Sequence, residues 1–184
     1  MANSTANVAT GKPKVGGAFY IAPAGTTLPN DATTALANAF VCAGHISDAG
    51  LKNNNSRETA EVKAWGGDVV LNPVTGHTDT FGATFIEVLN PQVLKLVHGN
   101  SNVSGTLSDG ITVNVNGADL NHYVMVVEMV LNGAMKRIVI PDGQVTAVGE
   151  VSYTDADAVG YETTITGYPD ASGNTHYEYI KAAS

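Results

Sequence analysis

Apolar and polar residues alternate with a period of two along several stretches of the chain. Ile111, Val113 and Val115 occupy alternate positions, and the residues between them are polar. The same alternation recurs over residues 80–85 and 144–153. Because successive side chains of a strand point to opposite faces of its sheet, each stretch places its apolar residues on one face. The pattern therefore predicts half-buried strands in antiparallel sheets.

A longer apolar run predicts the centre of the sheet. Residues 122–131 read HYVMVVEMVL and are nearly all apolar, which is typical of a strand covered on both faces. Asn132-Gly133 follows directly, and this dipeptide accepts the positive φ angles of a two-residue type I′ turn. We therefore expect residues 134–140 to return as an antiparallel partner.

The turn also fixes which residues of this hairpin face each other. With Leu131 opposite Ala134, Glu128 falls opposite Arg137. A charged side chain inside an apolar strand is costly unless it gains a partner, and a cross-strand neighbour of opposite sign supplies one. We predict an internal ion pair between Glu128 and Arg137.

The clearest helix signal is short. Asn90 is suited to the N-cap, Pro91 to the first helical position, and Gly99 to the position after the last turn, so residues 91–98 are predicted to be helical. Residues 30–40 are a weaker candidate, because their threonines and asparagines have low helix propensity. The expected fold is mainly β, with two packed antiparallel sheets and one short flanking α-helix.

The chain reads as one β domain with a leading arm. Residues 1–16 are small and polar without periodicity, which predicts a flexible N-terminal arm, and residues 17–184 form the domain. Within the domain, residues 48–56 read DAGLKNNNS and are polar and rich in turn formers. We expect them to form a projecting loop or hairpin tip.

Charge is sparse but unbalanced. The chain has 9 basic and 17 acidic residues, only 14% of the total, and a net charge of −8. An acidic chain repels phosphate, which argues against a basic nucleic-acid-binding surface. We find neither an apolar stretch of membrane-spanning length nor a secretory signal, and the single Cys42 cannot form an internal disulfide, so we expect synthesis in the cytoplasm and no membrane association.

The chemically active residue types form no known catalytic or metal-binding motif. The five histidines lack the spacing that places two ligands on one metal, and the glycine-rich segments lack the strand and helix context of a phosphate-binding loop. The serines show no nucleophile elbow. We therefore expect no enzyme activity, cofactor or metal. The C-terminal tyrosines leave a second possibility open, a sugar-stacking platform formed by Tyr161, Tyr168, Tyr177 and Tyr179.

In combination, five segments resemble the major tail tube protein of long, non-contractile (siphovirus-type) bacteriophage tails. The similarity extends from about Thr10 to the C-terminus. The segments are GKPKVGGAFYIAPAGTTLPNDATTAL, AWGGDVV, DTFGATFIEVLNPQVLKLVHG, MKRIVIPDGQV and GYETTITGYPDASGNTHYEYIKA.

The resemblance implies a structural subunit of the virion tail. Such subunits form hexameric rings that stack into a hollow tube, and one sheet of each subunit joins its neighbours around a channel through which double-stranded DNA passes. The implied partners are further copies of the chain, the tape-measure protein, and the tail terminator or tip proteins. The implied fold is a β-sandwich or barrel-like tube fold with no active site.

Within this family we expect an acidic channel wall, because phosphate contacts would hold the passing DNA. The candidate wall residues are Asp48, Glu58, Glu61 and Glu150. If the strand after the loop lines the channel, either Glu58 or Arg57 and Glu61 point inward, but not both. The expected contacts between rings involve the terminal arms and the projecting loop, with Lys52, Asn53, Asn54 and Asn55 as the candidate loop residues.

Two other functions compete with this hypothesis. One is a β-sandwich module that binds carbohydrate or decorates a virion surface. The other is the tube of a contractile or secretion machine, which would have the same fold class and a sheath as its partner.

Overall fold

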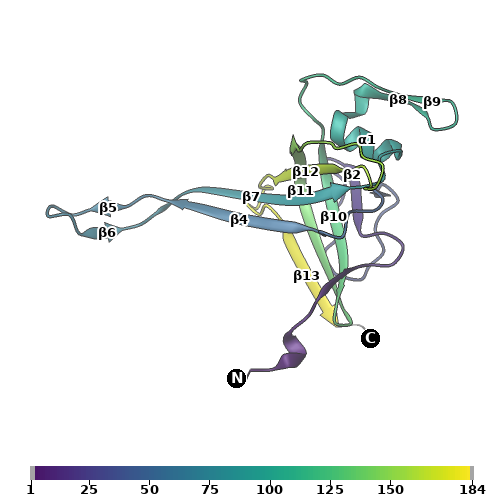
Figure 1. The fold of residues 1–184 in the computed structure, drawn as a ribbon. Coiled ribbons are helices and arrows are strands. Elements are labelled where there is room, and N and C mark those ends of the chain that lie inside the picture. The colour runs from purple at the N-terminus through teal and green to yellow at the C-terminus, as the bar shows by residue number, and fades with distance from the viewer. Residues whose placement is uncertain (1–2, 183–184) are drawn as a thin grey trace.

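The computed structural model describes residues 3–182, and residues 1–2 of the expected arm and 183–184 of the expected domain lie outside this range. The described chain is mainly antiparallel β with one short α-helix, as predicted (Figure 1). The elements are β1 (Gly11–Pro13), β2 (Phe19–Pro23), β3 (Val41–Cys42), β4 (Lys52–Thr59), β5 (Val62–Lys63), β6 (Val69–Leu71), β7 (Val74–Phe85), α1 (Pro91–His98), β8 (Val103–Thr106), β9 (Gly110–Val113), β10 (His122–Leu131), β11 (Ala134–Val148), β12 (Tyr161–Gly167) and β13 (Tyr177–Ala182), with 3-10 turns at Thr5–Asn7 and Asn100–Asn102.

The packed layers are opposite walls of one curled sheet. Its strand order is β3-β2-β10-β11-β12-β7-β4, with β1 added to β10 and β13 added to β11. The segment after β3 closes the curl, because it bonds to β2 near one end of the order and to β7 near the other. The Ala43 amide donates to the Phe19 carbonyl (2.9 Å), and the Ser47 amide donates to the Thr84 carbonyl (2.8 Å). The result is a small barrel without exposed edges along this seam.

The central hairpin has the predicted register. β10 and β11 are joined by Asn132 at φ 47° and Gly133 at φ 88°, as a type I′ turn requires. Leu131 pairs with Ala134, and Glu128 pairs with Arg137. The return strand is longer than the expected residues 134–140, because β11 continues to Val148 and so includes the first half of the strand expected over residues 144–153.

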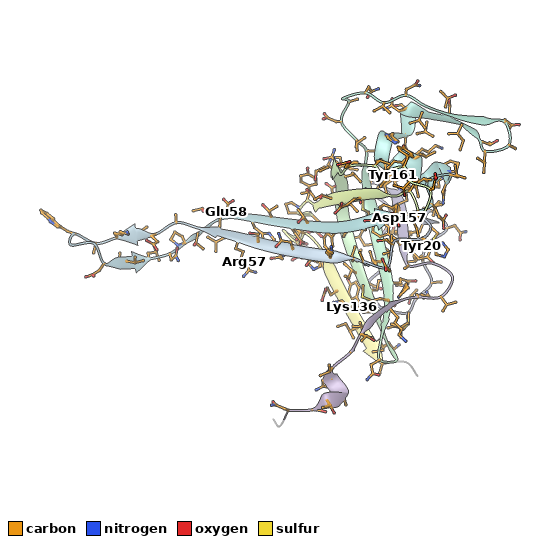
Figure 2. The ribbon with its side chains drawn as sticks, in the orientation of Figure 1. Tyr20, Arg57, Glu58, Lys136, Asp157 and Tyr161 are labelled. Atoms are coloured by element: carbon orange, nitrogen blue, oxygen red, sulfur yellow. The ribbon has the colours of Figure 1, made fainter. Side chains whose placement is uncertain are left out.

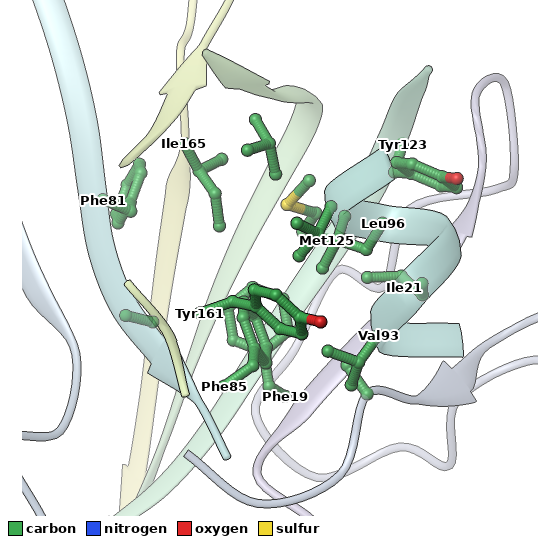
Figure 3. Packing of buried hydrophobic residues seen from close by; sticks show 14 of the residues in the cluster. Phe19, Ile21, Phe81, Phe85, Val93, Leu96, Tyr123, Met125, Tyr161 and Ile165 are labelled. Carbon is green, nitrogen blue, oxygen red and sulfur yellow. The ribbon is translucent and has the colours of Figure 1, made fainter. Parts of the chain in front are cut away.

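The main core fills the barrel, and α1 closes one end of it (Figure 3). The helix begins where predicted, because the Asn90 side chain accepts from the Gln92 amide (3.0 Å) and Pro91 starts the first turn. It ends at Gly99, whose φ is 94°. Its buried face meets aromatic and aliphatic side chains from the sheet, which include Phe19, Ile21, Phe81, Phe85, Met125, Ile140, Tyr161 and Ile165.

A second, smaller apolar layer covers the other face of β10. Val124 and Val126 are buried there, and Ala32 of the loop over residues 24–40 is buried as well. Residues 30–40 are not helical, contrary to the weaker expectation. The Asp31 side chain accepts from the amides of Thr33 and Thr34 (both 2.6 Å), and this local turn competes with a helix. The prediction that residues 122–131 form a strand covered on both faces is confirmed.

A long arm projects from the barrel at a different place from the one expected (Figure 1). Residues 48–56 were expected to project as a loop, but residues 52–59 form strand β4, because their asparagines pair across to β7. The part that extends beyond the barrel is the hairpin of residues 57–77, which we call the arm. Its end, residues 60–73, carries β5 and β6 and is called the arm tip.

The N-terminal segment is not wholly a free arm. Residues 3–10 are exposed, whereas Gly11–Pro13 form β1 and pair with the end of β10. The ordering has a local cause, since the Lys14 amide donates to the Glu128 carbonyl (3.2 Å) and the Lys14 ammonium pairs with the Glu128 carboxylate (2.5 Å).

Candidate functional site

One face of the sheet is uncovered and consists mainly of hydroxyl and amide side chains. Along β12, Tyr161, Thr163 and Ile165 are buried in the barrel, so the residues between them point outward. The register with β7 and β4 continues this outward set across the sheet. We call it the hydroxyl face. Its members are Lys52, Asn54, Ser56 and Glu58 of β4, Thr78, Thr80, Gly82 and Thr84 of β7, Thr146 of β11, and Glu162, Thr164 and Thr166 of β12.

The hydroxyl face lacks the side chains that would bind phosphate or an apolar partner. Among its members only Lys52 is basic, and Glu58 and Glu162 are acidic. Phosphate binding needs several basic contacts, and protein interfaces usually bury apolar or aromatic side chains. The face is therefore suited to contact with water or a hydrated ligand.

Acidic side chains gather at one margin of this face. Asp48 and Glu150 line a cavity of about 500 Å³ together with Glu162. The structure thus brings together two of the four candidate wall residues. Glu162 was missed by sequence reasoning, although its position between buried Tyr161 and Thr163 was a usable signal. Within residues 3–182, no group of three or more histidine, cysteine or carboxylate side chains is arranged to hold a metal.

The other two candidate wall residues lie on the arm. Glu58 belongs to the hydroxyl face, whereas its neighbour Arg57 points to the opposite side (Figure 2). Glu61 lies in the arm tip, where its carboxylate is 3.5 Å from the Lys63 ammonium. Glu58 and Arg57 thus lie on opposite faces of β4, as their adjacent positions along the strand predict. If this sheet face lines a channel, Glu58 points into it and Arg57 does not.

The four candidate loop residues lie at the root of the arm. Lys52 and Asn54 belong to the hydroxyl face, and Asn53 and Asn55 belong to the opposite face of the same strand. The Asn53 amide donates to Asp79 (2.8 Å), and Asn55 contacts His77 (3.1 Å). These residues anchor the arm to the barrel instead of forming an exposed loop.

Asp79 is the centre of that anchor. It is fully buried and accepts from Asn53 of β4, from Thr175 (2.7 Å) and from His176 (2.5 Å). Burial raises the pKa of this carboxyl, but the three donors outweigh burial and hold the pKa below its usual value. The cluster ties the arm to the segment that leads into β13.

The arm itself is unusually apolar for an exposed hairpin. Trp65 at its turn is 107% exposed, and no strand outside the tip pairs with β5 or β6 among the described residues. A two-stranded hairpin alone is only marginally stable in water, so this segment needs a partner. The exposed apolar side chains of the arm are Val62, Trp65, Val69, Val70, Leu71 and Val74.

The predicted pair of Glu128 and Arg137 lies in the β10–β11 hairpin. The structure brings them together, and the Arg137 Nε donates to the Glu128 carboxylate (2.9 Å), with both side chains 1% exposed. Arg137 also donates to the carbonyls of Asp31 (2.7 Å) and Thr34 (2.8 Å). Lys14 binds the second oxygen of Glu128, so the buried pair holds the N-terminal segment through Glu128 and the loop over residues 24–40 through Arg137.

Comparisons with known proteins give a family and a distant structural likeness. A family model described as phage tail tube protein matches residues 1–184. No curated protein sequence matches the chain. The chain is similar to the tube-terminating cap of the anti-feeding prophage, known from cryo-electron microscopy, with a TM-score of 0.44 and 9% identity over 100% of both chains. In residues 3–182, no helix has the length and apolar character needed to cross a bilayer.

Proposed function

Because the chain belongs to the phage tail tube protein family, we propose that it forms hexameric rings that stack into the tail tube and enclose the channel for DNA during ejection. A phage tail tube protein is a structural protein of the virion tail. The family favours the expectation that the chain is not an enzyme. We further propose the tape-measure protein and the terminator or tip proteins as partners, and synthesis in the bacterial cytoplasm. The non-contractile tail type stays a prediction.

The observation that carries this proposal is the apolar arm. Six exposed apolar side chains lie on a hairpin that projects from the barrel. Large exposed apolar patches mark interaction surfaces, and a projecting patch that meets a different surface on an identical copy generates rings or open helical assemblies. The low charge of the chain supports the same conclusion, because burying charged side chains between copies is costly.

The hydroxyl face is the best candidate for the channel wall. Its members provide one lysine and two glutamates over four strands, and further carboxylates of Asp48 and Glu150 lie at its margin. A wall of this kind gives passing DNA no series of phosphate contacts, so affinity does not accumulate along the duplex. Hydroxyl groups keep bound water that can exchange between wall and DNA.

The carbohydrate-binding alternative receives less support from the tyrosines. Tyr161 is buried, and the hydroxyls of Tyr168 and Tyr177 donate to Gln144 (3.0 Å) and Asp170 (2.5 Å). Tyr177 and Tyr179 stack on each other with ring centroids 6.3 Å apart. The tyrosine side chains are therefore engaged in contacts within the chain, and they do not present a free aromatic surface on which a sugar could stack.

Electron microscopy of the purified chain tests the proposal. We expect rings and hollow rods at raised protein concentration in negative stain. A chain that stays monomeric at high concentration and binds glycans would instead support the carbohydrate-binding module.

Lysine substitutions on the hydroxyl face test its role in the channel. We expect tubes carrying Thr80→Lys and Thr164→Lys together to retain DNA and to slow delivery, because each ring would add basic contacts to phosphate. The measurement is DNA delivery by phage with normal tails at several salt concentrations. Ser108→Lys on the exposed turn after β8 is the matched control. Normal delivery without retained DNA in the double variant would remove the hydroxyl face from the channel wall.

A further inference from the structure

The place where the arm leaves the barrel is held by one buried carboxylate. Along β7, Asp79 is the first buried residue, and Phe81 and Ala83 follow it on the same face. The carboxylate therefore lies close to the point where β7 passes from the arm into the barrel (Figure 1). Because Asp79 is 0% exposed, donors within the chain must satisfy both of its oxygens.

The two oxygens of this carboxylate bind segments that are far apart in the sequence. Oδ1 accepts from the Asn53 side-chain amide of β4 (2.8 Å). Oδ2 accepts from the Thr175 hydroxyl (2.7 Å) and from His176 Nδ1 (2.5 Å), directly before β13. The His176 ring also packs edge-on against Phe81, with centroids 5.3 Å apart. One rigid, planar group thus holds the root of the arm through one oxygen and the start of the C-terminal strand through the other.

Neither of the two strands has a buried side chain of its own. Strand β4 is exposed along its whole length, and no residue of β13 is buried. Within residues 3–182, β4 pairs with β7 alone and β13 pairs with β11 alone. Exposed strands of this kind open locally at a low free-energy cost, so a buried contact at one end has a large share in holding them closed.

We propose that Asp79 couples the arm to β13, so that fixing either segment also fixes the other. This inference goes beyond the proposed function, because the coupling acts within one chain whether or not the chain forms a tube. It has a geometric cause. The carboxylate is planar, so a movement of Oδ1 with Asn53 draws Oδ2 away from Thr175 and His176.

An electrostatic cause acts in the same direction. Burial disfavours the charged carboxylate of Asp79, and each donor stabilises the charge that the other donors bind. Loss of one donor therefore weakens the bonds to the others. Coupling between two sites is reciprocal, so a partner that holds the arm should also stabilise β13, and a partner that holds β13 should also steady the arm.

Two asparagines of β4 provide the test, with amide hydrogen exchange of the full chain as the measurement. Asn53→Ala removes the donor on the arm side only. We expect the amides of Tyr177–Ala182 to exchange about 5-fold faster or more, while those of β10 keep their rate. Asn55→Ala is the matched control, because Asn55 lies on the same face of β4 but contacts His77 (3.1 Å). It should leave β13 unchanged at a concentration where all chains sediment alike.

The reverse direction is measured in the same way. Thr175→Val keeps the shape of the side chain and removes its hydroxyl donor. We expect faster exchange over Lys52–Thr59, which Thr175 does not contact through any hydrogen bond of the described chain. Asn174→Ala is the control for this direction, since the neighbouring Asn174 side chain donates to the Tyr177 hydroxyl instead (3.1 Å).

A third substitution tests whether the effect passes through the carboxylate. In a chain that carries Asp79→Asn, adding Asn53→Ala should produce no further change in β13. Unchanged exchange of β13 in Asn53→Ala, or an equal increase in Asn55→Ala, would overturn the coupling. An equal increase in β10 would mark global unfolding and would overturn it as well. Each of these results leaves the proposed function standing, because electron microscopy of the unsubstituted chain tests that function separately.

Discussion

Removing the arm tip is expected to abolish tube assembly while leaving the barrel folded. Thr59 and Val74 are paired neighbours in the β4–β7 register, so an Asn-Gly turn can join them directly in place of residues 60–73. Every side chain in the deleted segment is exposed, and none belongs to the core. The shortened chain should therefore keep its melting temperature within a few degrees and sediment as a monomer.

A smaller change should give a graded effect. Trp65→Ser is expected to raise the concentration needed for assembly by about 30-fold, because loss of an interface hot spot typically costs about 2 kcal/mol. The control replaces Leu107–Asp109, the turn of the other exposed hairpin, with Asn-Gly and should assemble normally. Normal tubes from the chain without its arm tip would contradict the role of the arm.

Arg137→Ala is expected to lower the free energy of unfolding by about 3–5 kcal/mol, the usual cost of removing one partner of a buried ion pair. Arg137 is 1% exposed and binds both Glu128 and the carbonyls of Asp31 and Thr34. Its loss leaves those acceptors without their donors and Glu128 with Lys14 alone. Urea denaturation followed by circular dichroism measures the change.

Two further variants make that result specific. Lys136→Ala is the matched control, since Lys136 is the adjacent residue and its partner Glu178 is 42% exposed. The Lys136 side chain is 18% exposed, so the pair is partly open to water, and a solvent-screened pair contributes about 1 kcal/mol at most. Glu128→Leu with Arg137→Met should recover much of the lost stability, because removing both charges leaves no buried charge unpaired. An unchanged unfolding midpoint for Arg137→Ala would refute the structural role of the pair.

The elements that could be predicted from the sequence are those specified by residues close to one another along the chain. The β10–β11 hairpin follows from Asn132-Gly133 between two apolar runs, and its register follows from the turn alone. Helix α1 is specified in the same way by Asn90, Pro91 and Gly99. Each signal needs only a few residues of chain, so distant contacts do not override it.

The arm could not be placed from the sequence because it has no buried face. Periodicity detects strands that pack one side against a core, and β4 is exposed along its whole length. Its asparagines suggested a loop, but Asn53 satisfies Asp79, which also binds His176, 97 positions away along the chain. The same limit applies to the acidic margin, since only the folded chain brings Asp48 beside Glu150.

The most direct test of the account is a helical cryo-electron microscopy reconstruction of the assembled chain at side-chain resolution. We predict a hollow tube of hexameric rings in which Thr80, Thr164 and Thr166 face the channel and each arm leaves its own ring to contact another copy. A map in which the hydroxyl face is buried between subunits or lies on the outside of the tube would contradict the account.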